Sequence, residues 1–295
     1  QIVGGSNRMV NEASPIVDAR LSDGSRVNIV LEPIALDGSA ISIRKFPREP
    51  IRMADLIAME TLTLEAAEAL KVLVEAGYNI FISGGTGSGK TTFLNALSQY
   101  IPGEERIITI EDSAELQLLD KPNLVRLETR NRNTPEVVPV TIRDLIRTAL
   151  RMRPSRIIVG ECRGAEALDV LWAMNTGHDG SLSTGHANSS RDMLGRLETM
   201  VLMGMELPLA AIRSQIASGI DILVHLGRLR DKSRKVLSIA EVEGISEGEI
   251  MLNELFCFVE KGSSKGKVCG QLVRRGRLIH TEKCSLAGVT FPENE

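Results

Sequence analysis

Aromatic residues are scarce in this chain of 295 residues, at 3% of the sequence against an apolar content of 43%. Proteins that bind single-stranded nucleic acid stack bases on aromatic side chains, so the shortage argues against that function. Neither sign of charge dominates, because 35 basic and 38 acidic side chains leave a net charge of −3. Such a balance gives no general attraction to nucleic acid or to membranes. We therefore expect no nucleic-acid partner.

Cysteine is also sparse, and the chain has neither paired C-x-x-C spacing nor the density of a secreted disulfide scaffold. We expect reduced thiols and a cytoplasmic protein. No apolar run reaches the roughly 18 residues that a transmembrane segment needs, and the start, QIVGGSNRMV, does not resemble a secretory signal. Because residue 1 is Gln rather than Met, we expect part of the protein to lie upstream.

Short strand-like patterns fill residues 1–48. Apolar and polar side chains alternate in SRVNIVLEP and again in ISIRKF, which follows the turn residues Asp37 and Gly38. These patterns predict a small antiparallel sheet with Arg26 and Arg44 on its polar faces. The proline-bearing stretch FPREP then predicts a linker, so we divide the chain into residues 1–48 and 49–295.

Strands alternate with helices after residue 50. Thr63 is suited to begin a helix and Gly77 to end it. Apolar strands are predicted in YNIFIS, ERIITIED, RIIVGE and GSLSTGHA. Buried strands separated by helices indicate parallel βαβ units, whose sites lie at the carboxyl ends of the strands. After residue 220 the pattern predicts antiparallel hairpins, a β-rich C-terminal extension.

The segment GGTGSGKT fits the phosphate-loop pattern G-x-x-x-x-G-K-[ST] at every position, between a predicted strand and a predicted helix. Glycines let the backbone form a nest of N–H donors around phosphate oxygens. We expect Lys90 to reach the β- and γ-phosphates and Thr91 to ligate Mg²⁺. A chance match to a glycine-rich turn is the alternative. The predicted ATP-binding residues are Gly84, Gly85, Thr86, Gly87, Ser88, Gly89, Lys90, Thr91 and Thr92.

Carboxylates end two of the predicted strands. In RIIVGECRG the strand delivers Glu161, which could orient and deprotonate an attacking water or hold Mg²⁺. Gly160 stands before it, so the metal-binding aspartate usual at this position is absent. ITIEDSAEL ends similarly at Glu111 and Asp112, with Glu115 beyond, and these acids could share that work or cap the next helix. A solvated carboxylate is the alternative for Glu161.

Arginines form a further group of candidates, because a guanidinium aimed at a γ-phosphate stabilises the charge that develops on transfer. Most surface arginines have no such role, so each remains open at this point. The candidates are Arg26, Arg44, Arg126, Arg130, Arg132, Arg151, Arg153 and Arg163.

Together the segments GGTGSGKT, ITIEDSAEL, RIIVGECRG and TGHDGSLSTGHANS, in this order, resemble the Walker A, Asp, Walker B and His boxes of the secretion ATPase superfamily, which serves type II and type IV secretion and type IV pilus assembly. The stretches VDARLSDGSRVN and PIALDGSAISIRKF look closest to the branch that assembles tight-adherence (Flp-type) pili, the CpaF kind. The tetracysteine zinc insert typical of pilus extension ATPases is missing, which agrees with that branch.

The resemblance implies an α/β fold: a RecA-like P-loop NTPase core with a mainly parallel sheet, preceded by part of a small α+β sensor-like N-terminal domain and followed by β hairpins. It further implies a Mg²⁺-dependent ATPase in a hexameric ring, at the cytoplasmic side of the inner membrane through a platform protein. N-terminal arginines reach the nucleotide in this family, a role that falls to Arg26 and Arg44. The resemblance does not say whether this shortened chain closes the ring.

The His box holds His178 and His186, two of the chain's four histidines. Their spacing alone favours structural histidines in a polar turn. Beside the other boxes, His186 is better interpreted as a sensor that donates to the γ-phosphate and loses that partner after hydrolysis, whereas His178 stays open. His225 and His280 are interpreted as structural or surface residues.

Two other functions remain open. Gly160 in place of the aspartate is compatible with a nucleotide-gated scaffold that hardly turns ATP over. RecA-like rings also translocate DNA, although the composition argues against a DNA motor. The sequence does not distinguish pilus assembly from retraction or secretion, and it does not identify the transported substrate.

Overall fold

The computed structural model describes residues 10–21, 23–45, 49–130 and 138–292. The chain divides into two compact units, residues 1–49 with 130–140 and residues 50–129 with 141–295. The first division lies next to the predicted boundary between residues 48 and 49. The grouping of residues 130–140 with the first unit was not predicted from the sequence.

The first unit contains a three-stranded antiparallel sheet in the order β1-β2-β3. Its strands are β1 (Ile16–Arg20), β2 (Arg26–Val30) and β3 (Ala40–Arg44). Val27 and Ile29 are buried on one face of β2, while the residues between them are partly exposed. This alternation follows from the period of two residues in a strand. The strands predicted in SRVNIVLEP and ISIRKF are confirmed, and β1 is an addition.

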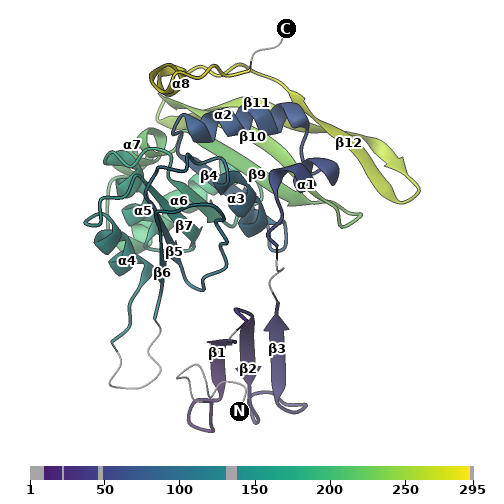
Figure 1. Ribbon diagram of the computed structural model, residues 1–295, viewed down its shortest axis with the longest axis vertical. Coiled ribbons are helices and arrows are strands. Elements are labelled where there is room, and N and C mark those ends of the chain that lie inside the picture. The colour runs from purple at the N-terminus through teal and green to yellow at the C-terminus, as the bar shows by residue number, and fades with distance from the viewer. Residues whose placement is uncertain (1–9, 22, 46–48, 131–137, 293–295) are drawn as a thin grey trace. The chain divides into compact units, whose positions relative to one another are not determined.

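The second unit is built on one sheet of nine strands in the order β12-β11-β10-β9-β4-β8-β7-β5-β6 (Figure 1). The strands from β9 to β6 in this order are parallel, and β10, β11 and β12 continue the sheet as antiparallel neighbours. The bounds are β4 (Ile80–Gly84), β5 (Ile107–Glu111), β6 (Leu124–Glu128), β7 (Arg156–Cys162), β8 (Leu182–Gly185), β9 (Ile222–Arg228), β10 (Arg234–Ser246), β11 (Glu249–Ser264) and β12 (Lys267–Arg274).

Helices cover both faces of this sheet, as the buried strands predict. Ile80 and Ile82 of β4 pack in one core cluster and Phe81 in the other, because successive side chains point to opposite faces. The first cluster takes side chains from α1 (Met53–Ala58), α2 (Leu64–Glu75), α3 (Lys90–Ser98) and α8 (Glu282–Ala287). The second takes them from α4 (Ile142–Ala149), α5 (Ala167–Asn175), α6 (Ser190–Gly204) and α7 (Leu209–Gly219).

Local signals in the sequence place several helix ends correctly. The Thr63 hydroxyl accepts a hydrogen bond from the Ala66 N–H at the start of α2, and Gly77 follows the end of that helix in the left-handed region. Thr141 and Asp144 form the predicted capping box of α4. The α/β fold with a mainly parallel sheet and a β-rich C-terminal part is thereby confirmed.

Several features differ from the prediction. The strand β9, expected in an antiparallel extension, pairs in parallel with β4 and so belongs to the central sheet. The strand β8 ends at Gly185, so His186 follows this strand rather than lying on it. The strand β6 and the helix α8 were not predicted, since both are short and carry weak periodicity. Among the described residues, no helix is long and apolar enough to cross a membrane.

Candidate nucleotide site

The phosphate loop joins β4 to α3 at the carboxyl edge of the parallel strands. Gly89 caps α3 with φ +96°, a conformation that glycine adopts without strain, and it offers no side chain to the first N–H groups of the helix. Those N–H groups are free to bind an anion. Gly85, Thr86 and Gly87 are exposed, whereas Ser88 and Lys90 are buried.

Lys90 lies across the phosphate loop. Its Nζ donates to the Gly84 carbonyl at 3.0 Å and to the Gly85 carbonyl at 3.2 Å, and it lies 3.2 Å from His186 Nδ1. Burial lowers the pKa of Lys90, and the Glu161 carboxylate opposes that effect. The ammonium group is therefore held by weak acceptors that a phosphate can replace.

Glu161 lies on β7 with only 21% of its side chain exposed. Its Oε2 accepts a hydrogen bond from Arg163 Nη2 at 2.7 Å. Its Oε1 lies 2.7 Å from His186 Nε2, yet this buried oxygen has no well-aligned donor among the described residues. The carboxylate is thus fixed by Arg163 and keeps one oxygen able to accept a further hydrogen bond.

His186 bridges the phosphate loop and Glu161 because of its place in the sheet. The strand β8 lies between β4, which leads into the loop, and β7, which carries Glu161. Burial and the Lys90 charge lower the pKa of His186, so the imidazole is neutral at pH 7. Lysine can only donate, so Nδ1 accepts and the ring proton lies on Nε2, which is 2.7 Å from Glu161 Oε1. Lys90, His186, Glu161 and Arg163 form one continuous polar chain.

Glu111 ends β5 with 3% of its surface exposed. Its Oε2 accepts hydrogen bonds from the N–H groups of Glu115 and Leu116, and its Oε1 has no partner among the described residues. Burial raises the pKa of Glu111 to about 7. A Cβ atom on Gly160 would lie 2.9 Å from Glu111 Cγ, so Glu111 fills the space that a side chain at position 160 would need.

The other acids of this edge are less central. Asp112 Oδ1 accepts a hydrogen bond from the Thr129 hydroxyl at 2.8 Å, and its Oδ2 lies 3.8 Å from Arg163 Nη1. Glu115 contributes its backbone N–H to Glu111. Asp112 is therefore tied to the edge of the site through Arg163.

Among the arginine candidates that follow residue 120, Arg163 joins the site. Arg126 donates to the Leu116 carbonyl at 2.9 Å, a contact that fixes the segment after β5. Arg151 and Arg153 precede β7, so they lie at the amino edge of the strands, away from the phosphate loop. Arg132 lies outside the described residues, and Arg130 donates to the Val138 carbonyl.

Arg26 and Arg44 belong to the first unit, where they face each other across β2 and β3. Arg26 also lies 3.8 Å from Asp18. Like charges directly opposite each other in a sheet are unfavourable unless an anion lies near them. Their approach to a nucleotide stays a prediction.

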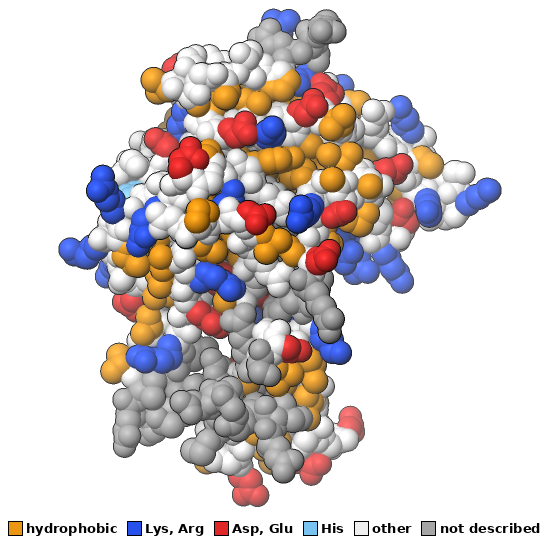
Figure 2. Space-filling view, in the orientation of Figure 1, with side chains coloured by type: hydrophobic (Ala, Val, Ile, Leu, Met, Phe, Trp, Pro, Cys, Tyr) orange, Lys and Arg blue, Asp and Glu red, His pale blue; other side chains and the backbone are white. Residues whose placement is uncertain are grey.

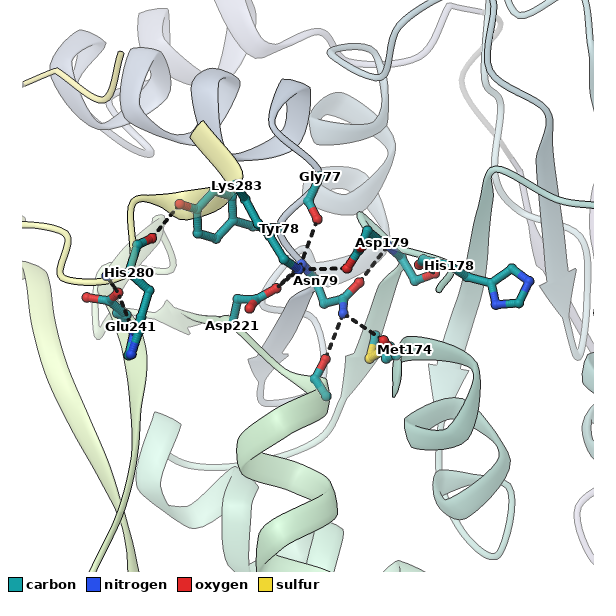
Figure 3. Close-up of polar contacts among 12 residues, drawn as sticks. Gly77, Tyr78, Asn79, Met174, His178, Asp179, Asp221, Glu241, His280 and Lys283 are labelled. Carbon is teal, nitrogen blue, oxygen red and sulfur yellow. Dashed lines mark hydrogen bonds and ion pairs between the residues drawn. The ribbon is translucent and has the colours of Figure 1, made fainter. Parts of the chain in front are cut away.

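The two histidines of the His box lie at opposite edges of the sheet. His178 precedes β8 at the amino edge, where its Nδ1 lies 3.3 Å from the Ala173 carbonyl oxygen; Figure 3 shows this side chain beside Asp179. Next to it, Asp179 accepts from Lys283 Nζ at 2.8 Å, and Asp221 accepts from the same ammonium at 2.7 Å. This cluster anchors α8 to the amino edge. His178 is thus remote from Glu161 and structural in its contacts.

The remaining histidines also have partners. His225 is buried with its Nδ1 2.9 Å from the Ser83 hydroxyl, beneath the phosphate loop. His280 lies beside the buried Glu241 carboxylate, which also accepts from the backbone N–H groups of Ile279 and His280 (Figure 3).

One contact at the phosphate loop was missed. Arg234 Nε donates to the Gly87 carbonyl at 2.8 Å from the start of β10. The signal was present in GRLRDKSRK, where basic residues gather around a hairpin turn. The arginine candidates taken from the sequence lay on the N-terminal strands or near the strands β5 and β7, and the parallel pairing of β9 with β4 was not foreseen.

Comparison with known proteins gives a consistent result. Residues 3–287 match the family described as type II/IV secretion system protein. Type IV secretion system protein PtlH of Bordetella pertussis is 37% identical over 258 residues, which cover 78% of this chain and 76% of that protein. Conjugal transfer protein TrbB of Rhizobium radiobacter is 34% identical over 238 residues, covering 79% and 70%.

Solved structures show the same architecture. The VirB11 ATPase of the Brucella suis type IV secretion system, crystallised with sulphate, is similar with a TM-score of 0.53 and 32% identity, covering 79% of this chain and 75% of that chain. The pilus retraction motor PilT with bound ADP has a TM-score of 0.55 over 95% of this chain and 71% of its own, at 20% identity, and so supports the fold alone. With the phosphate loop and its carboxylates in place, this chain is a P-loop NTPase that belongs to the type II/IV secretion ATPase family.

Proposed function

We propose that this protein binds ATP with Mg²⁺ at the phosphate loop, hydrolyses it with Glu161 as the principal catalytic carboxylate, and powers pilus assembly or protein secretion at the inner membrane. The observation that carries the proposal is the polar chain from Lys90 through His186 to Glu161 and Arg163. Through His186, this chain connects the phosphate-binding ammonium of Lys90 to a carboxylate able to orient water. Residues 84–92, from Gly84 to Thr92, would hold the phosphates.

Two buried oxygens support a Mg²⁺ site. Glu161 Oε1 and Glu111 Oε1 are buried without a well-aligned donor among the described residues, an arrangement suited to accept hydrogen bonds from metal-bound water. No group of three or more His, Cys, Asp or Glu side chains among the described residues could hold a metal by itself. That fits Mg²⁺, which binds through one or two protein groups, phosphates and water. Thr91 and Glu161, partly through water, would hold it, and it would neutralise charge on the β- and γ-phosphates.

Each residue has a task in this proposal. Glu161 orients and deprotonates the attacking water, while Arg163 holds this carboxylate in place. Glu111 supplies the second carboxylate, in the space left by Gly160. When Lys90 turns to the phosphates, His186 Nδ1 loses its partner, so the imidazole can respond to the γ-phosphate.

Arg26 and Arg44 would complete the site from the N-terminal unit by stabilising charge on the transferred phosphoryl group. In a hexameric ring, closing on ATP would move this unit and pass the motion to a neighbouring subunit.

The cellular role is proposed on the family and on the resemblance of the N-terminal stretches to the tight-adherence branch. PtlH is named for type IV secretion and TrbB for conjugal transfer. We propose an inner-membrane platform protein as the partner, and a position at the cytoplasmic side of that membrane.

A complementation experiment tests the motor against a nucleotide-gated scaffold. Cells that lack the gene receive the full-length protein, its Glu161→Gln variant or its Lys90→Ala variant, and pili and secreted protein are measured. A motor requires both residues, so both variants should fail. Normal output with Glu161→Gln alone would favour the scaffold, because this variant keeps ATP binding. Stimulation of hydrolysis by DNA would instead favour a DNA motor.

A further inference from the structure

The β9–β10 hairpin lies against the phosphate loop. Gly84, the last residue of β4, is the register partner of Leu226 in the parallel strand β9. The strand β9 continues to Arg228, so its end runs past the beginning of the phosphate loop at the same edge of the sheet. Within the hairpin, Arg228 and Arg234 are direct cross-strand partners. Their side chains therefore lie on the same face.

Arg234 touches the loop at two points. Its Nε donates to the Gly87 carbonyl at 2.8 Å, and its Cδ lies 3.3 Å from the position of a Cβ on Gly89. The side chain thus lies along the segment whose N–H groups face a phosphate. An arginine has five N–H donors, and the Nη groups of Arg234 have no hydrogen-bond partner among the described residues. They remain available for an anion.

Arg228 is exposed, and no ion pair or hydrogen bond of its side chain occurs within the described ranges. Two guanidinium groups directly opposite each other repel in the free protein. A phosphate between or beside them would remove that repulsion. Figure 2 shows basic side chains gathered at the ends of the hairpins, at the right of the view.

Other contacts hold the hairpin in place, so the position of Arg234 does not depend on its own hydrogen bond. Asp231 accepts a hydrogen bond from the Ser233 N–H at 2.9 Å and another from the Val268 N–H of β12 at 2.8 Å. The Ser233 hydroxyl also donates to Asp231, and this hydrogen bond, followed by those from the two N–H groups, lowers the pKa of Asp231 to about 2. Arg230 pairs with Glu260 of β11. These contacts hold the hairpin independently of Arg234.

We propose that Arg228 and Arg234 form a basic wall of the nucleotide site, supplied by the same chain, which binds the phosphates of a nucleoside di- or triphosphate. Arg234 also positions the loop, because its Nε fixes the Gly87 carbonyl outward and so directs the neighbouring N–H groups to the phosphate. This inference rests on nucleotide binding at the phosphate loop and adds two ligands to it.

The test measures ADP and ATP dissociation constants and thermal stability for the full-length protein. Arg234→Ala should weaken both nucleotides roughly tenfold, the loss expected for a charge-assisted contact that is partly exposed to solvent. Arg234→Lys should recover part of the affinity, because its ammonium reaches phosphate as a point charge but cannot also fix Gly87. Lys232→Asn removes an equal charge at the turn of the same hairpin and should leave binding unchanged.

Arg228→Ala distinguishes a phosphate-binding role from a structural role more clearly than Arg234→Ala does. Removing the repulsion should leave the nucleotide-free protein as stable or more stable, while ADP binding weakens threefold or more. A residue that only supports the fold would lower stability and leave affinity unchanged, and that outcome for both arginines would overturn the inference. Measuring ADP binding distinguishes a failure of nucleotide binding at the phosphate loop from a failure of the basic wall. If the parent protein binds no nucleotide, the proposed function fails, whereas unchanged binding by Arg228→Ala and Arg234→Ala refutes only the basic wall.

Discussion

Replacing His186 with alanine should separate ATP binding from ATP hydrolysis. The imidazole contacts Lys90 Nζ at 3.2 Å and Glu161 Oε1 at 2.7 Å, so its loss removes two contacts to charged groups. Lys90 keeps its contacts with the Gly84 and Gly85 carbonyls, and a phosphate can replace either. We therefore expect the ATP dissociation constant to change by less than about threefold, which corresponds to well under 1.4 kcal/mol.

Hydrolysis should suffer more, because Glu161 loses the imidazole whose Nε2 lies 2.7 Å from its Oε1 and can donate to that oxygen once the two groups align. A hydrogen bond to a charged group contributes about 1.5–3 kcal/mol. The His186 side chain is 37% exposed, so solvent screening favours the lower value, and about 1.5 kcal/mol corresponds to a roughly tenfold fall in kcat. His186→Gln should recover part of the rate, since an amide can both donate and accept.

The assay combines steady-state phosphate release with equilibrium binding of a fluorescent nucleotide. His178→Ala is the matched control, because this histidine belongs to the same segment and lies at the opposite edge of the sheet. It should change neither quantity. An unchanged kcat in His186→Ala, or a loss of affinity as large as the loss of rate, would refute the bridge between Lys90 and Glu161.

Three further predictions follow from single contacts. Gly160→Ala would place a Cβ 2.9 Å from Glu111 Cγ, so hydrolysis should fall at least tenfold, with stability lowered by about 1–3 kcal/mol; wild-type rates would contradict this packing. Because burial raises the pKa of folded Glu111 from 4.5 to about 7, the folded protein keeps a proton that the unfolded chain releases, and the free energy of unfolding should fall as pH rises through this window, by on the order of 3 kcal/mol at most. Urea denaturation in EDTA at pH 5 and pH 8 should show that the free energy of unfolding depends less on pH in Glu111→Gln than in the parent protein. An equal change between the two pH values in both proteins would exclude Glu111 as the cause. Lys283→Met leaves Asp179 and Asp221 without their shared cation and should cost about 1–3 kcal/mol in thermal unfolding while the ATP affinity stays unchanged; an unaltered melting temperature would show that α8 is anchored otherwise.

Local patterns in the sequence predicted much of the fold because the deciding forces are local. Thr63 and Gly77 mark the ends of α2, and the apolar runs of β4, β5 and β7 are buried on both faces. The order of the strands depends on long-range pairing, which no short pattern encodes. The parallel placement of β9 beside β4 was therefore missed, and with it the contact of Arg234 with Gly87.

The candidate site shows the same division. Lys90, Glu111 and Glu161 each end or follow an apolar strand, so the parallel sheet brings them to one edge as expected. That His186 lies between Lys90 and Glu161 depends on β8 lying between β4 and β7. The role of Gly160 was invisible in the sequence, where it stood only for a missing aspartate. A residue without a side chain is needed at position 160 because Glu111, on the neighbouring strand β5, occupies that space.

The central claim is that Glu161 drives ATP hydrolysis at the phosphate loop. The most direct test is the steady-state rate of Mg²⁺-dependent ATP hydrolysis by the full-length protein and by its Glu161→Gln variant, with binding of ATP confirmed for both. We expect hydrolysis in the parent and a loss of about 100-fold or more in the variant, since a positioned general base contributes at least that factor. Equal rates, or no hydrolysis by the parent in any oligomeric state, would contradict the account.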